Sequence, residues 1–164
     1  MITYLVAAII LGVGATLAID LWSLFLKRAF GIPSLSYCML GRWFLHMPGG
    51  TFMHARIGEA QPKASECVVG WIAHYGIGIF LSLVFLALAG RGWLAHPSLA
   101  PALGFGVVTT LIPFLVLQPS IGLGIASAKA PNPTRARLKS LSTHSVFGLG
   151  LYLSALLLAP RLSP

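Results

Sequence analysis

Three ionisable side chains lie inside long apolar stretches of the chain: Asp20, His74 and His144. An ionised carboxylate at bilayer depth costs about 2.5–3.5 kcal/mol on insertion scales, so Asp20 is expected to be protonated or paired inside the protein. An imidazole changes its charge close to neutral pH. Two imidazoles and a carboxylate can therefore exchange protons, and they can also bind a metal ion such as zinc or iron.

The elements that carry these residues are expected to be membrane-spanning helices. Of the 164 residues, 57% are hydrophobic and 9% are charged, whereas soluble domains carry roughly 25% charged residues. A spanning helix needs about 20 mostly apolar residues. Stretches of this kind lie at about 2–26, 67–89, 100–117 and 141–159. The sequence predicts an all-α fold, an integral membrane four-helix bundle that forms a single domain over residues 1–164.

The depths of the polar residues along these helices predict a common layer. Asp20 lies six residues before the end of the first span, and His74 lies seven residues into the second. His144 lies near the start of the fourth span, and Gln118 follows the third. At a rise of 1.5 Å per residue, these groups are expected roughly 5–10 Å below one membrane face. Asp20, His74, His144 and Gln118 are therefore the predicted binding site for a substrate or a proton.

The placement of the basic residues predicts the orientation of the protein. The formal net charge is +8, and nine of the eleven Lys and Arg residues fall in the two long loops, after the first span and before the fourth. This is the positive-inside pattern, which accounts for the charge without nucleic acid as a partner. It predicts cytoplasmic long loops, both termini outside, and a bacterial cytoplasmic (inner) membrane location. Cys38 and Cys67 then fall on the cytoplasmic side, where reduced thiols are expected.

The first long loop is apolar and aromatic, and it is interrupted at Pro33, Pro48 and Pro62. It is too short to span a bilayer, so short interfacial helices are expected there. Arginines in the two long loops can grip a phosphate or carboxylate of an anionic lipid headgroup. The candidates are Arg42, Arg135 and Arg137.

Small and polar residues recur every fourth position along the spans. Ala8, Gly12, Thr16 and Asp20 form one such stripe, which marks the face that packs against other helices. A second stripe runs through Gly70, His74, Gly78 and Ser82, and the fourth span repeats it at His144, Gly148 and Tyr152.

A possible internal repeat relates the two halves of the chain. Residues 74–91 align without a gap on residues 144–161, with eight of eighteen positions identical, and 11–20 resembles 103–112. Two tandem helical hairpins related by a pseudo-two-fold axis would produce this pattern. Leu, Gly and Ala are frequent in both segments, so chance similarity is the competing explanation.

Four interpretations of the polar layer are open. The first is a hydrogen-bonded cluster that only fixes the register of the helices. The second is a conduit for a proton, an ion or a small polar solute. The third is a metal site of His74, His144 and Asp20, and the fourth is a haem site between the two histidines. No nucleophile and base can be assigned from spacing, so an enzyme is not the expected class. The sequence requires no cofactor. The leading expectation is a small binding or transport protein in the lipid bilayer; the alternative is a structural or accessory subunit of a homo-oligomer or a larger membrane complex.

Three segments carry a resemblance to a known family. They are GVGATLAIDLWSLFLKRAFGIPSLSYCMLGRWFLHMPGGTFMH (12–54), GWIAHYGIGIF (70–80) and QPSIGLGIASAKAPNPTRARLKSLSTHSVFGLGLYLSA (118–155). Together they resemble a family of small bacterial inner-membrane proteins known as a domain of unknown function. The resemblance implies a four-span membrane protein and assigns no activity and no site residue.

Overall fold

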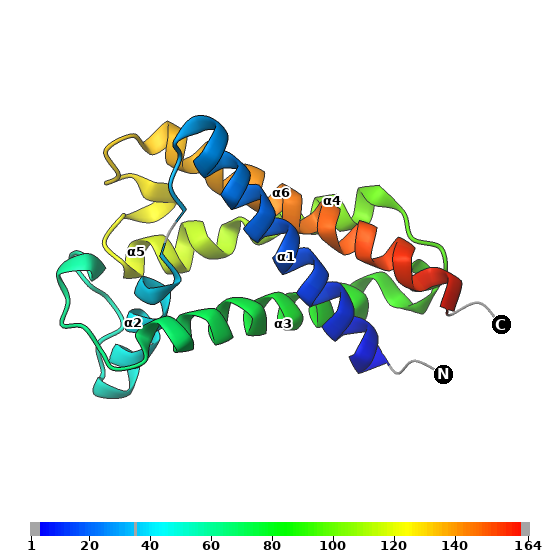
Figure 1. Cartoon of the computed structure of the whole chain (residues 1–164), viewed down its shortest axis with the longest axis horizontal. Coiled ribbons are helices and arrows are strands. Elements are labelled where there is room, and N and C mark those ends of the chain that lie inside the picture. Colours follow the sequence, from blue (N-terminus) through cyan, green and yellow to red (C-terminus); the bar gives the residue numbers. More distant parts are fainter. Residues whose placement is uncertain (1–3, 35, 162–164) are drawn as a thin grey trace. The chain divides into compact units, whose positions relative to one another are not determined.

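The described part of the chain consists of helices joined by loops, and this part contains no strand. A computed structural model describes residues 4–34 and 36–161. The long helices are α1 (Tyr4–Phe30), α3 (Glu66–Ala95) and α6 (Pro133–Leu158). The shorter α4 (Leu99–Thr109) follows α3 along the chain (Figure 1). The all-α fold class predicted from the sequence is confirmed.

Among the described residues, four helices are long and apolar enough to cross a membrane. They cover Tyr4–Phe30, Glu66–Gly90, Leu99–Ser120 and Pro133–Leu158. Leucines on these segments face outward, among them Leu21 at 59% exposure, Leu88 at 75% and Leu157 at 80%. A soluble monomer rarely exposes apolar surface so extensively, whereas a lipid environment favours it. The chain is therefore an integral membrane protein with four candidate spans.

The four spans differ from their predicted bounds by up to eight residues, and two of their ends have clear local causes. The second span ends at Gly90, whose φ of 78° is left-handed and breaks the helical geometry within α3. The fourth begins at Pro133, eight residues before the predicted start, because Pro is favourable at the first helical position and Asn132 caps the helix. The backbone N–H of Arg135 donates to Oδ1 of Asn132 at 3.0 Å.

The third span contains the irregularity that its prolines predict. The helix widens into a π-helix, η3 (Pro113–Leu117), and continues into the short α5 (Gln118–Ser120). Pro113 has no N–H and its ring crowds the preceding turn, so the regular hydrogen-bond ladder cannot continue there. The N–H of Gln118 instead bonds to the carbonyl oxygen of Pro113, five residues earlier.

The chain divides into two compact units, which we describe separately. Of the described residues, unit 1 comprises 4–33, 75–108 and 142–161, and unit 2 comprises 34, 36–74 and 109–141. The core of unit 1 includes Leu11, Leu86, Phe147 and Leu151, each at most 2% exposed. The core of unit 2 is smaller and is built around Leu40, Trp43, Ile57 and Ile121.

Unit 1 is held together by close helix contacts at glycines. A Cβ on Gly12 of α1 would meet the backbone of Gly78 and Ile79 in α3 at 2.5–2.9 Å. In α4 and α6, a Cβ on Gly106 would meet the backbone of His144 and Gly148. Small residues permit this approach of two helix backbones, which is typical of packing in membranes.

These contacts agree with the predicted packing stripes. Ala8, Gly12, Thr16, Gly78, Ser82 and Gly148 are all buried. Gly78 and Gly148 also occupy matching positions of the proposed repeat, and each faces the first helix of its own hairpin. The pseudo-two-fold symmetry itself stays a prediction.

Unit 2 contains the short helices of the first long loop. They are α2 (Tyr37–His46), which continues into the 3-10 turn η1 (Met47–Gly49), and a second 3-10 turn, η2 (Ile57–Glu59). The second long loop, also in unit 2, contains the 3-10 turn η4 (Ile125–Ser127). The remaining 3-10 turn of the described residues, η5 (Ala159–Arg161), belongs to unit 1 and follows α6. Short helical pieces were expected in the first loop; their interfacial location stays a prediction.

Two glycines of α4 provide a matched test of the helix contact. Gly106→Ala should destabilise the protein by about 1–3 kcal/mol, because the added methyl group meets the backbone of α6. Gly104 has nothing within 4 Å of an added Cβ, so Gly104→Ala should be neutral or should stabilise the helix by up to about 1 kcal/mol. Thermal unfolding of the detergent-solubilised protein, followed by circular dichroism, measures both. Equal effects of the two substitutions would contradict the proposed contact.

Candidate functional site

Asp20 accepts a hydrogen bond from a neighbouring helix of unit 1. The hydroxyl of Tyr75 in α3 donates to Oδ2 of Asp20 in α1 at 2.9 Å. The crossing of Gly12 and Gly78, two turns along α1 from Asp20, brings the two helices close enough for this bond. Both side chains are half-buried. The carboxyl group thus has a hydrogen-bond donor inside the protein, as the cost of burying it requires.

A second polar contact joins the same turn of α1 to α6. Nε1 of Trp22 donates to Oγ of Ser142 at 3.3 Å. One turn earlier, Oγ1 of Thr16 donates to the carbonyl oxygen of Gly12 in its own helix at 2.7 Å. The end of α1 that carries Asp20 is therefore linked by polar side chains to both α3 and α6.

The depth predicted for His144 is consistent with this contact. Ser142 and His144 are two residues apart in α6, and Trp22 and Asp20 are two residues apart in α1. Gly150 of α6 lies against Ala15 and Ala18 of α1, so residue numbers run in opposite directions along the two helices. Asp20 and His144 accordingly lie at a similar level of unit 1.

The other two predicted polar residues belong to unit 2. His74 stacks on Tyr37, with ring centroids 4.0 Å apart and planes inclined by 23°, and its centroid lies 6.0 Å from that of Trp71. Nε2 of Gln118 donates to Oγ of Ser140 at 3.0 Å, while its Oε1 is buried and has no hydrogen-bond partner. A shared centre of these two residues with Asp20 and His144 stays a prediction.

The metal site expected from the sequence gains no support. Within residues 4–34 and 36–161, no three side chains of His, Cys, Asp and Glu form a group that can hold a metal ion. The proposed ligands were His74, His144 and Asp20. Asp20 accepts the bond from Tyr75, His74 takes part in an aromatic stack, and a metal site of these three residues stays a prediction.

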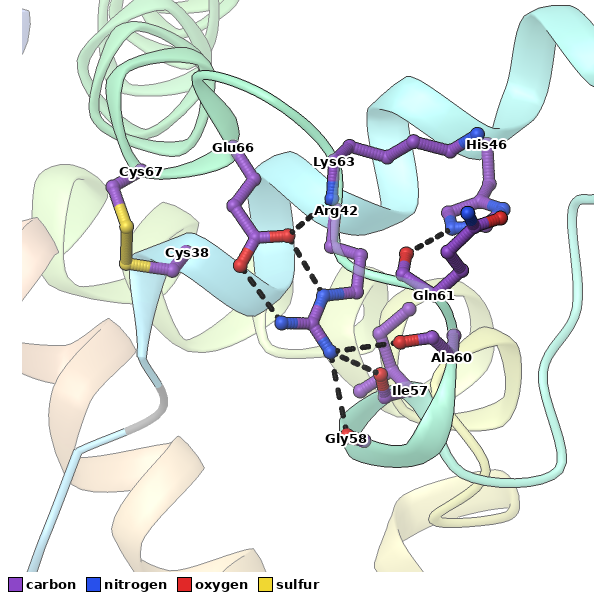
Figure 2. A network of polar contacts seen from close by, with 10 residues as sticks. All are labelled: Cys38, Arg42, His46, Ile57, Gly58, Ala60, Gln61, Lys63, Glu66 and Cys67. Atoms are coloured by element: carbon purple, nitrogen blue, oxygen red, sulfur yellow. Dashed lines mark hydrogen bonds and ion pairs between the residues drawn. A yellow bond between two sulfur atoms is a disulfide. The ribbon is translucent and has the colours of Figure 1, made fainter.

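Arg42 takes part in a polar network within unit 2, and the headgroup contact predicted for it stays a prediction. Its Nε and Nη2 donate to the two carboxylate oxygens of Glu66 at 2.8 and 2.7 Å, a bidentate pair that Figure 2 shows from close by. Its Nη1 donates to the carbonyl oxygens of Ile57, Gly58 and Ala60 at 3.0–3.3 Å. The two charged side chains are 13% and 14% exposed. The hydrogen bond to Glu66 raises the pKa of the Arg42 guanidinium.

Arg137 also donates a hydrogen bond to a backbone carbonyl group. Its Nε donates to the carbonyl oxygen of Ala126 at 2.8 Å, in a loop where Ala126 and Ser127 have left-handed φ angles of 48° and 56°. Such angles are unfavourable for residues other than glycine and need support from their surroundings. A headgroup contact of Arg135 or Arg137 stays a prediction.

The expectation of reduced thiols is wrong, because Cys38 and Cys67 form a disulfide. Their Cα atoms are 3.8 Å apart where α2 crosses the first turn of α3. A Cβ on Gly41 would overlap the carbonyl oxygen of Glu66, and one on Gly70 would overlap that of Tyr37. The sequence carried a signal for this pairing: the motif Cys-x-x-Gly occurs once in each helix, at 38–41 and at 67–70.

Four apolar spans with a carboxyl group bonded between two of them define an α-helical integral membrane protein. Within that class, the chain belongs to the family described as protein of unknown function (DUF2938), whose sequence profile matches residues 9–158. No curated protein and no solved structure matches the chain.

The ion pair of Arg42 and Glu66 can be tested against an exposed pair in the same unit. Glu66→Gln should lower the free energy of unfolding clearly more than loss of the exposed pair does, because it removes both hydrogen bonds and the counter-charge of a guanidinium that is only 13% exposed. Arg56 and Glu59 also pair, at 2.6 Å, but they are 75% and 67% exposed, so Glu59→Gln should cost about 0–1 kcal/mol. Chemical denaturation in detergent compares the two variants. A Glu66→Gln effect no larger than that of Glu59→Gln would disprove the structural role.

Proposed function

We propose that this chain is a small binding or transport protein of the bacterial inner membrane, and that Asp20 is the group that takes up and releases a proton. The observation that supports this proposal is the Asp20–Tyr75 hydrogen bond within two membrane-spanning helices. A phenol hydroxyl can donate to the ionised carboxylate and can also accept from the protonated acid, so this contact is compatible with both states of Asp20. Protonation removes the cost of holding a charge at bilayer depth, and release of the proton restores it.

Residues from α6 extend the proposed site. Ser142 is linked to the turn of Asp20 through Trp22, and His144 lies at a similar level. An imidazole and a carboxyl group at one level are suited to passing a proton between them, directly or through water. A proton, or a small polar solute that moves with one, is accordingly the proposed cargo.

Reconstitution into liposomes tests the proposal with the proton as the probe. Liposomes that contain a trapped pH-sensitive dye should acidify faster with the wild-type protein than without protein when a membrane potential is applied. Asp20→Asn should abolish this difference because the amide cannot carry a proton, and Tyr75→Phe should reduce it. Tyr152→Phe removes a hydroxyl from a tyrosine of α6 and serves as the matched control, which should behave as wild type.

Two outcomes would contradict the transport proposal. One is wild-type protein that conducts no faster than empty liposomes; the other is an Asp20→Asn variant that conducts like wild type. If Asp20→Asn lowers the melting temperature and changes nothing else, the polar contacts serve only to hold the helices, as in the alternative of a structural or accessory subunit.

We also propose that the two long loops face the cytoplasm and that both termini lie outside. Nine of the eleven basic residues lie in these loops or in the helix ends that border them, and this placement supports the orientation. The disulfide opposes it, because disulfides persist mainly in oxidising compartments. We give the charges priority because they act on the orientation of the chain as it is inserted, whereas a disulfide between adjacent cysteines can form later.

Thiol labelling of right-side-out membrane vesicles distinguishes the two orientations. A membrane-impermeant maleimide, added after an impermeant reductant, should leave Cys38 and Cys67 unlabelled, and it should label them in inverted vesicles. A cysteine placed at the exposed His96, in the turn between α3 and α4, serves as the control for the opposite side and should show the reverse pattern. Labelling of Cys38 and Cys67 in right-side-out vesicles would reverse the proposed orientation.

A further inference from the structure

Two histidines of unit 2 meet although neither belongs to the site described above. His46 is the last residue of α2, and His54 lies in the extended segment that follows. Their ring centroids are 5.0 Å apart, and the ring planes are inclined by 82°. Two imidazoles that bind one metal ion at about 2.0–2.1 Å have centroids roughly 5–6 Å apart. The observed separation is therefore compatible with a shared ion.

The turn after α2 brings the two histidines together. The segment Pro48-Gly49-Gly50 ends the helix, and Gly50 adopts a left-handed φ of 79° that reverses the chain direction. The returning segment is then attached to α2, because Nε1 of Trp43 donates to the carbonyl oxygen of Phe52 at 2.8 Å.

The backbone on both sides of His54 is held by the other long loop of unit 2. The N–H of His54 donates to the carbonyl oxygen of Ser120 at 2.8 Å, and that of Ile57 donates to the carbonyl oxygen of Ile121 at 3.2 Å. Backbone hydrogen bonds thus anchor the segment that carries His54.

His46 has the hydrogen bond that a metal-binding imidazole usually has. Its Nε2 lies 2.9 Å from the carbonyl oxygen of Gln61. A carbonyl oxygen only accepts, so Nε2 carries a proton, and in the neutral imidazole Nδ1 then has the lone pair. Histidines that bind metals commonly donate their other N–H to a backbone carbonyl in this way.

Arg42 and Glu66 hold the segment that carries Gln61. Nη1 of Arg42 bonds to the carbonyl oxygen of Ala60, and the backbone N–H of Lys63 donates to Oε2 of Glu66 at 3.0 Å (Figure 2). The carbonyl that orients His46 therefore lies between two fixed points of the ion-pair network.

His54 lacks hydrogen-bond partners for its ring. Both of its ring nitrogen atoms are buried, and neither has a hydrogen-bond partner. Buried polar atoms of this kind are rare in folded proteins and need an explanation such as a bound water or ion. One neutral imidazole nitrogen always has a lone pair, which a metal ion at this position would satisfy.

We propose that His46 and His54 form a site for a divalent transition metal ion of the copper, nickel and zinc class. Imidazole nitrogens suit these metals, whereas magnesium and calcium prefer oxygen ligands. Cys38 and Cys67 are joined to each other and supply no thiolate. The two histidines occupy two coordination positions, and water or an external ligand would complete the shell. Copper(II) should bind most tightly, because it heads the usual affinity order of divalent metals.

The test uses the full-length protein in detergent, purified without a histidine tag and freed of metal by a chelator. Titration with copper(II) should show one equivalent bound per chain, with two imidazole nitrogens seen by pulsed electron paramagnetic resonance. His46→Gln and His54→Gln should each lower the affinity by about tenfold or more and leave one coordinated imidazole. His96→Gln is the matched control: His96 is exposed in a turn of unit 1, and its replacement should leave the affinity and the spectrum unchanged.

Several results would overturn the proposal. They are no copper binding by the wild-type protein, a wild-type spectrum with fewer than two coordinated imidazoles, and an unchanged affinity in both site variants. Displacement of copper by an equal concentration of magnesium would also overturn it. The wild-type spectrum is decisive even if a variant fails to fold, because it counts the imidazoles directly.

Discussion

The close approach of α2 to the first turn of α3 is the constraint on which unit 2 depends. Gly41 and Gly70 lie at the crossing, and neither position has room for a Cβ atom. Because the backbones meet there, residues three positions earlier in each helix come within disulfide distance. Arg42, the residue after Gly41, then donates to the carboxylate of Glu66 through both Nε and Nη2. A larger residue at either glycine would disrupt the disulfide and the ion pair together.

Unit 1 applies the same physical principle to helices that cross the membrane. With no hydrophobic force to drive helices together in lipid, association depends on close packing and on hydrogen bonds between side chains. The glycine contacts of α1 with α3 and of α4 with α6 provide the packing. The bond from Tyr75 to Asp20 provides the polar part, and it is possible only because the two helix axes lie so close.

The sequence was sufficient to predict features that are local or periodic. The four spans follow from apolar runs, the irregular third span follows from Pro113, and the buried face of α1 follows from the spacing of Ala8, Gly12 and Thr16. Features that depend on distant residues were not predicted. The partner of Asp20 is 55 positions away, that of Arg42 is 24, and that of Cys38 is 29. Periodicity predicted which face of a helix is buried, but it did not identify the residue that this face meets.

The acidic residues of the chain show how environment separates structural from chemical roles. There are three, and all lie in the described part of the chain. Glu59 and Glu66 accept bonds from arginines, and a guanidinium stabilises the ionised form of a carboxyl group. Asp20, inside a span, accepts its bond from a neutral hydroxyl. A hydroxyl can donate to the carboxylate or accept from the protonated acid, so it serves both states of Asp20. The two glutamates are thus matched to one charge state, whereas the Tyr75 hydroxyl beside Asp20 is compatible with either state.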